Sequence, residues 1–402
     1  MSDLKEFLTS ENFYLSTISR NDAAAYEKKA LLQFEENGEI TGIGNSSKFW
    51  EIQENELVFL NQEKQENDRF TISENFEEEI SGKSEKTNSV LLPTKSTKIE
   101  SLKVESSHDR QSMLSFVNMA SPEYQQLQEF AANDKTLDGY AEGNYFLVPR
   151  KLLNLGFSRD SDLEIDYMLE KPLKPDSKAP KNLVIEFHWL EHQDVSAYVR
   201  MYGTSKRPRN FRASLAPNTY VLRIADSNLI SGSYFFNTEN FPDYEENLQK
   251  FIQKIAAEEE IPLENIICYG FSRGGTAALY HAALGGYASV AIDPVVDRSP
   301  WLLNGRDLHL IFDFLPVSFL DKLSTVLVQT KSDSRQLQVI CAEESEAVYP
   351  EILKLDLSKI TLKNLKIKLN KGNPIGNHGQ LFSKTFPLQL STLNHFLYKL
   401  PD

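Results

Sequence analysis

The strongest constraint on the fold is a regular alternation that runs from about residue 152 to the end of the chain. Short apolar runs rich in β-branched residues alternate there with segments of helical spacing. The runs are Leu183–Phe187, Tyr220–Ile224, Ile266–Tyr269, Ser289–Ile292, Leu337–Ile340 and Leu365–Leu369. Short runs bounded by turns are typical of strands buried on both faces, and strand–helix alternation predicts a mainly parallel sheet between helices. The sequence therefore predicts an α/β fold for this part.

The front of the chain, residues 1–106, has the pattern of a small β-rich accessory module. Apolar and polar residues alternate from Trp50 to Phe59 on both sides of Glu54-Asn55-Glu56, which predicts a hairpin. Phe70-Thr71-Ile72 predicts a further strand, and the polar residues 81–89 predict a loop. Two roles fit such a module: it binds a ligand or partner, or it only packs against the rest of the protein.

A chain of 402 residues is long enough for two or three domains. We expect a mixed connection at residues 107–159 and a larger domain at residues 160–402, with an insertion at about 298–335. The net charge is −14, and the first 110 residues hold −9 of it, with 13 Lys and Arg against 22 Asp and Glu. An acidic balance repels nucleic-acid phosphates and anionic membrane surfaces, so we expect neither as a partner.

The location of the protein is suggested by what the sequence contains and lacks. No apolar stretch approaches the ~18 residues of a membrane span, and the start, Met1 to Glu6, lacks the basic-then-apolar pattern of a secretory signal. Cys268 and Cys341 both lie in apolar runs, which favours buried thiols over a disulfide. These features predict a cytoplasmic protein without a membrane span.

One pentapeptide carries the chemistry: Gly270-Phe271-Ser272-Arg273-Gly274 matches G-x-S-x-G. This spacing suits a sharp strand-to-helix turn that presents a serine hydroxyl, with small residues that let the backbone pass closely. An apolar strand precedes the motif, a small-residue helical segment follows it from Gly274, and Gly285-Gly286 predicts the end of that helix. The context therefore favours a nucleophilic serine at position 272.

Residues 160–402 resemble the α/β-hydrolase superfamily. The resemblance rests on the order of a strand at Ile266–Tyr269, the serine turn, a helix and the next strand at Ser289–Ile292. The resemblance implies a catalytic triad in the chain order serine, acid, histidine. Beyond His281 of the helix, the downstream histidines are His309, His378 and His395. His378 stands in Gly376-Asn377-His378-Gly379, which we expect to be a flexible loop before a closing helix at Leu388–Leu400. We therefore predict His378 as the general base, with a structural role as the alternative.

The acid of the triad has several candidates. The resemblance places it after the strand at Leu337–Ile340, where Ser345 stands in the register at which many relatives carry aspartate. A glutamate can hold the imidazole equally well, so Glu344 is the first choice, with Glu343 and Glu346 as alternatives. Asp293, at the end of the preceding strand, is a further competitor.

An oxyanion hole needs two backbone N–H groups. The resemblance implies that the first belongs to Arg273. The second would come from Phe187-His188-Trp189-Leu190, which replaces the family's usual His-Gly, so we choose Trp189 first and Leu190 next.

Two further segments, residues 200–212 and the insertion at about 298–335, are candidates for the surroundings of the active site. Residues 200–212 hold five basic side chains, which either bind an anionic substrate or form a solvated loop. The insertion is apolar and aromatic at Trp301–Leu303 and Leu310–Leu315, which fits a lid over the site or a plain buried helix. The seven histidines are dispersed and the zinc spacings Cys-x-x-Cys and His-Glu-x-x-His are missing, so we expect no metal.

The stretch from Val221–Ile224 through Gly270–Tyr280 is similar to bacterial capsular-polysaccharide biosynthesis proteins. It is also similar to the hydrolase-like component of accessory Sec systems, which acetylates sugars on serine-rich glycoproteins. The resemblance implies O-acetylation of a carbohydrate polymer or glycoprotein, with no bound cofactor and an acyl donor such as acetyl-CoA. Two alternatives stay open: a serine esterase, and a non-catalytic scaffold in a secretion or capsule complex.

Overall fold

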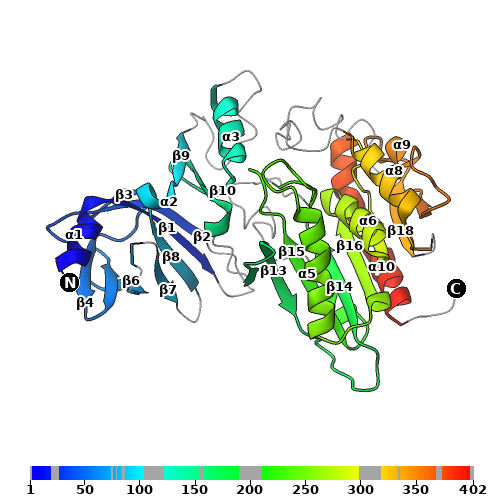
Figure 1. Cartoon of the computed structure of the whole chain (residues 1–402), viewed down its shortest axis with the longest axis horizontal. Helices are drawn as coiled ribbons and strands as arrows, with labels where there is room; N and C mark the ends of the chain where they lie inside the picture. Colours follow the sequence, from blue (N-terminus) through cyan, green and yellow to red (C-terminus); the bar gives the residue numbers. More distant parts are fainter. Residues whose placement is uncertain are drawn as a thin grey trace. The chain divides into compact units, whose positions relative to one another are not determined.

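The structure is a computed structural model, and the residues that it describes are 2–19, 27–73, 76–77, 79–83, 87–103, 122–153, 158–189, 211–230, 232–297, 318–333, 336–367 and 374–398. These residues form two compact units, one reaching to residue 153 and the other starting at residue 158. Figure 1 shows the elements of both units along the sequence.

The first unit contains an eight-stranded sheet in the order β3-β2-β1-β8-β7-β6-β5-β4, with every neighbouring pair antiparallel. Its strands are β1 (Asn12–Ser19), β2 (Glu27–Phe34), β3 (Ile40–Ile43), β4 (Phe49–Gln53), β5 (Glu56–Leu60), β6 (Glu66–Thr71), β7 (Ile80–Lys83) and β8 (Thr87–Pro93). The predicted hairpin is confirmed, because Trp50 pairs with Phe59 across β4 and β5. The predicted loop at 81–89 is wrong at both ends, because backbone pairing extends β7 to Lys83 and starts β8 at Thr87 despite the polar side chains.

The first unit also holds a three-stranded sheet in the order β10-β11-β9. Its elements and the unit's short helices are α1 (Ser2–Ser10), α2 (Thr94–Thr97), β9 (Glu100–Lys103), α3 (Pro122–Ala132), β10 (Lys135–Ala141), β11 (Asn144–Pro149) and η2 (Arg150–Leu152). Residues 122–153 of the expected mixed connection therefore form one helix, one hairpin and the short helix η2. They belong to this unit because β11 pairs with β9.

The second unit is built on an eight-stranded sheet in the order β12-β13-β15-β14-β16-β17-β18-β19. Its strands are β12 (Ser158–Asp160), β13 (Ile165–Glu170), β14 (Asn182–Phe187), β15 (Thr219–Ala225), β16 (Ile266–Phe271), β17 (Ala288–Ile292), β18 (Leu337–Ala342) and β19 (Thr361–Leu365). The five neighbouring pairs from β15 to β19 are parallel, whereas β12 and β13 are antiparallel additions. The last strand ends at Leu365, where the sequence predicted its start, because Thr361 to Leu365 are the residues in register with β18.

Helices connect and cover the parallel strands of the second unit. They are η3 (Phe211–Ser214), α5 (Tyr244–Glu258), η4 (Leu263–Asn265), α6 (Arg273–Gly285), α8 (Phe319–Gln329), α9 (Tyr349–Ile352) and α10 (Pro374–Leu397). Alternate residues of β16, such as Ile267 and Tyr269, share a core cluster with Leu381 and Leu393 of α10. In Figure 1 α5 and α6 lie side by side along the strands, and α6 contacts β14, β16 and β17. Parallel pairing brings the carboxyl ends of β14 to β19 to one edge of this sheet.

The structure also shows the surroundings of the two cysteines and the hydropathy of the helices. Cys268 and Cys341 are free and fully buried, so the prediction of buried thiols is confirmed. Burial raises the pKa of both thiols above the usual value. In the described parts of the chain, no helix combines the length and apolar character needed to cross a membrane.

His281 on α6 makes the folded second unit sensitive to acid. Its ring is fully buried, with Nε2 donating to the Phe235 carbonyl at 3.0 Å and Nδ1 3.2 Å from Gln249 Nε2. Burial lowers the pKa of His281 from 6.5 to about 4, so between these values the unfolded chain binds a proton that the folded chain excludes. Between pH 6.5 and about pH 4, we expect this residue to lower the free energy of unfolding by up to ~1.4 kcal/mol for each pH unit.

Urea unfolding at pH 7 and pH 5 measures this effect. The His281→Gln variant cannot take up the proton, so its unfolding free energy should fall less between the two pH values than that of the wild type. Equal falls in the two proteins would contradict the assignment.

Candidate active site

Ser272 occupies the turn between β16 and α6. Its backbone has φ 57° and ψ −122°, a strained conformation that non-glycine residues rarely adopt. Its N–H donates to the Ile292 carbonyl at 2.9 Å, and its own carbonyl accepts from the Thr276 N–H at 3.0 Å. The adjoining strand and helix therefore hold the strained turn, as the G-x-S-x-G spacing predicts.

The glycines of the motif are required because backbone segments pass very close to them. A Cβ on Gly270 would lie 2.2 Å from the Gly274 carbonyl oxygen. A Cβ on Gly274 would lie 2.1 Å from the carbonyl oxygen of Phe187, at the end of β14. Any side chain at either position would push β14, β16 and α6 apart.

His378 contacts the serine from α10. Its Nε2 lies 2.7 Å from Ser272 Oγ, and its ring stacks on Phe271 with the centroids 4.8 Å apart. The expected flexible loop at this position is wrong, because α10 already begins at Pro374. Of the other downstream histidines, His395 lies near the end of α10, and His309 lies outside the described residues.

The carboxylate that contacts His378 is Asp293, not Glu344. Asp293 directly follows β17, its side chain is fully buried, and its Oδ2 lies 2.7 Å from His378 Nδ1. With Asp293 on Nδ1 and Ser272 on Nε2, both ring nitrogens are occupied. The first-choice prediction of Glu344 is therefore wrong, and the competitor Asp293 takes its place.

The three glutamates after β18 have other surroundings. Glu344 Oε2 accepts a hydrogen bond from the Ile367 N–H at 3.4 Å. Glu343 Oε1 accepts from Asn364 Nδ2 at 2.9 Å, and Glu343 and Glu346 are exposed. Asp293 reaches the histidine because its φ of 45° turns the chain at the end of β17, while its N–H donates to the Ile340 carbonyl at 2.8 Å.

Two residues were predicted as oxyanion-hole donors. Arg273 is the first residue of α6, directly after Ser272. A Cβ on Gly274 would lie 3.0 Å from the carbonyl carbon of His188, the atom bonded to the Trp189 nitrogen, so the loop after β14 packs directly on the turn. This places the Trp189 peptide next to the turn at Ser272. That the backbone N–H groups of Arg273 and Trp189 form the oxyanion hole stays a prediction.

Aromatic rings form an apolar wall beside the histidine. The Trp189 and Phe382 ring centroids are 4.8 Å apart, and those of Phe271 and Phe382 are 5.2 Å apart. Because Phe271 also stacks on His378, this wall excludes water from one side of the imidazole.

A buried ion pair supports the turn at Ser272, and no motif in the sequence indicates it. The Arg273 Nη1 and Asp226 Oδ2 atoms are 3.7 Å apart, and both side chains are buried. Arg273 Nε also donates to the His188 carbonyl at 3.4 Å. Burial, with a contribution from the Arg273 charge, lowers the pKa of His188 to about 3, so this histidine is neutral at ordinary pH.

Several predicted features fall outside the described residues. Leu190, residues 200–210 of the basic segment and residues 298–317 of the insertion belong to this group. Of the basic segment, Arg212 is described, and its Nη1 lies 2.8 Å from Glu170 Oε1. Among the described residues, no group of three His, Cys, Asp or Glu side chains is arranged to hold a metal.

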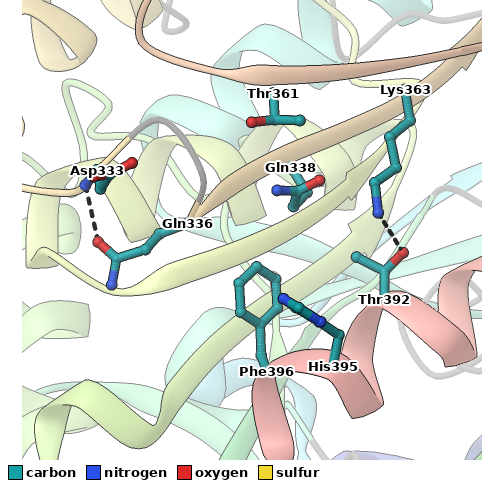
Figure 2. Close-up of a pocket in the computed structure, with 8 residues that line it drawn as sticks. All are labelled: Asp333, Gln336, Gln338, Thr361, Lys363, Thr392, His395 and Phe396. Atoms are coloured by element: carbon teal, nitrogen blue, oxygen red, sulfur yellow. Dashed lines mark hydrogen bonds between the residues drawn. The ribbon is translucent and has the colours of Figure 1, made fainter. Parts of the chain in front are cut away.

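The second unit also has a cavity of about 750 Å³ that is lined mainly by polar residues (Figure 2). It is lined by Gln338 near the start of β18, Thr361 at the start of β19, and His395 near the end of α10. The cavity therefore lies at the amino ends of β18 and β19, whereas Ser272 and Asp293 follow the carboxyl ends of β16 and β17. The cavity is therefore not the pocket of the candidate triad.

Comparisons with known proteins give similarities of structure alone. No protein-family model matches the chain, and no curated protein sequence matches it. The capsule O-acetyltransferase of Neisseria meningitidis serogroup A is similar at 15% identity and a TM-score of 0.40, over 58% of this chain and 98% of that one. The acylaminoacyl peptidase of Pyrococcus horikoshii is similar at 12% identity and a TM-score of 0.40, over 98% of this chain and 55% of that one. An S-formylglutathione hydrolase of Agrobacterium tumefaciens is similar at 10% identity and a TM-score of 0.40, over 59% of this chain and 94% of that one.

Proposed function

We propose that this protein is a serine-dependent acyltransferase that uses Ser272, His378 and Asp293 as a triad. The observation that carries the proposal is the continuous contact from Ser272 Oγ to His378 Nε2 and from His378 Nδ1 to Asp293 Oδ2, each at 2.7 Å. An ionised carboxylate can only accept hydrogen bonds, so Nδ1 carries the proton and Nε2 is the acceptor for the serine hydroxyl. This is the tautomer that a general base requires.

The first half of the reaction forms an acyl-serine ester. Ser272 Oγ attacks the carbonyl carbon of the acyl donor while His378 Nε2 takes the hydroxyl proton. The N–H groups of Arg273 and Trp189 are our proposed donors to the oxyanion of the tetrahedral intermediate. When that intermediate collapses, His378 returns the proton to the leaving group, which is a thiol if the donor is acetyl-CoA.

The second half transfers the acyl group to an acceptor hydroxyl. His378 Nε2 removes the proton of that hydroxyl while its oxygen attacks the ester carbonyl. As the tetrahedral intermediate collapses, the bond to Ser272 Oγ breaks and His378 returns the proton to Oγ, which restores the free serine. Water competes at this step, and the apolar wall of Trp189, Phe271 and Phe382 favours a larger acceptor over water.

The acceptor that we propose is a sugar hydroxyl of a bacterial surface or capsular glycan, free or carried on a glycoprotein. The resemblance of the stretch from Val221–Ile224 through Gly270–Tyr280 to capsular-polysaccharide biosynthesis proteins supports this acceptor class. A cytoplasmic location fits the same proposal, because activated acyl thioesters are made there.

An acetyl-transfer assay tests the proposal. The purified protein is given acetyl-CoA or an activated acetyl ester, with and without a capsular glycan, and acetylated glycan and free acetate are measured together. We expect glycan acetylation to exceed acetate release when the glycan is present. Acetate release that is fast and unaffected by glycan would instead identify a serine esterase, and the absence of both products would favour the scaffold alternative.

A further inference from the structure

We propose that Ser345 is a positioning residue of this site: its hydroxyl holds the Asp293 carboxylate in the orientation that His378 needs. The inference rests on the proposed function and adds a fourth member to the proposed triad. Its basis is a side-chain contact between the ends of two neighbouring strands, β17 and β18.

The contact is short and fully enclosed. Ser345 Oγ donates to Asp293 Oδ2 at 2.5 Å, and both side chains are 0% exposed. Oδ2 is also the oxygen that accepts from His378 Nδ1 at 2.7 Å. One carboxylate oxygen therefore accepts hydrogen bonds from both His378 and Ser345.

Asp293 depends strongly on these two donors. A buried carboxylate is stable only when hydrogen bonds replace its lost water. Within the described part of the chain, its other oxygen, Oδ1, has no hydrogen-bond partner. The hydroxyl of Ser345 is thus one of two side-chain groups that fix the acid, and the other is the histidine that the acid must itself orient.

Ser345 is well placed to fix another residue because its own backbone is tightly held. Its N–H donates to the Ala342 carbonyl at 2.9 Å, and its carbonyl accepts from the N–H groups of Val348 and Tyr349 at 2.9 and 2.8 Å. The Asp293 backbone is tied to the same strand through the Ile340 carbonyl. The turn after β18 therefore acts as a rigid support for the acid at the end of β17.

The test follows the reactivity of Ser272 itself and needs no knowledge of the natural substrate. A fluorophosphonate reagent is attacked at phosphorus by Ser272 Oγ, fluoride leaves, and His378 takes the hydroxyl proton, so the labelling rate reports the activation of the nucleophile. We expect Ser345→Ala to be labelled about ten-fold more slowly than the wild type, the usual effect of losing one hydrogen bond to a charged group. Ser332→Ala is the matched control, because Ser332 is also buried but donates to a backbone carbonyl, that of Tyr287, at 3.0 Å.

An isosteric pair separates the hydroxyl from packing. Threonine and valine have nearly the same shape, so Ser345→Thr and Ser345→Val share any packing cost and differ in the hydroxyl. We expect the threonine variant to be labelled about ten-fold faster than the valine variant. Equal rates for the two variants would overturn the proposal.

A double-mutant cycle shows whether Ser345 acts through Asp293. Ser345→Ala is also made in an Asp293→Ala background, because asparagine could still accept the serine hydrogen bond. We expect the second substitution to cause no further loss there, whereas a separate structural role would give the same ten-fold loss in both backgrounds. A wild type that is not labelled at Ser272 would overturn the proposed function and this inference together, while normal labelling of both the wild type and Ser345→Ala would overturn this inference alone.

Discussion

Ser272→Ala is expected to lower the turnover of an activated acetyl ester by about 10⁶-fold, the typical cost of removing the nucleophile of a serine triad. The variant keeps His378, Asp293 and the oxyanion-hole backbone, but the acyl-enzyme cannot form. Initial rates over a range of substrate concentrations measure the loss, and it should appear in kcat rather than in KM, because alanine leaves the pocket walled by Trp189 and Phe271 unchanged.

The controls for this experiment test the fold and the identity of the nucleophile. Ser272→Ala should unfold at nearly the same temperature as the wild type, since alanine must adopt the same φ of 57°. Ser332→Ala should keep wild-type turnover. A Ser272→Ala protein that retains a few per cent of the activity would show that another group attacks the substrate, and the acyltransferase and esterase readings would both fail.

Most strands of the second unit could be predicted from the sequence, because a strand buried on both faces is a continuous run of apolar residues. Five of its apolar runs coincide with β14 to β18, and the glycines around Ser272 marked the turn that the structure shows. The last strand was misplaced because β19 is an edge strand, and its residues Thr361 to Leu365 are only partly buried. An exposed strand does not need a continuous apolar run, so its position depends on pairing with β18.

The site was predictable where chemistry is local and not where it depends on tertiary contacts. Ser272 is defined by its own pentapeptide, and His378 by its place after the last strand. The acid depends on which of two neighbouring strand ends reaches α10, and this is decided by the positive φ of Asp293 and its bond to the Ile340 carbonyl. Neither feature has a signature in a single sequence. The one available signal was Ser345, a hydroxyl in the register where the resemblance leads one to expect the acid.

The choice between Asp293 and Glu344 leads to the second large effect. Asp293→Asn is expected to lower kcat by about 10⁴-fold, while Glu344→Gln should change it by less than about two-fold. The asparagine amide has nearly the shape of the carboxylate, but it can donate a hydrogen bond to His378 Nδ1. The ring proton then moves to Nε2, and the histidine can no longer accept the proton of Ser272.

The two variants form a matched pair, because each changes one carboxylate to its amide within the same unit. Rates with an activated acetyl ester measure the effect on catalysis, and thermal unfolding shows whether each variant is folded. A stable Asp293→Asn protein with near-normal activity, or a large loss in Glu344→Gln, would contradict the assignment of the acid. A large loss in Asp293→Asn alone would mean that the acid of the triad acts from the end of β17 and not from the turn after β18.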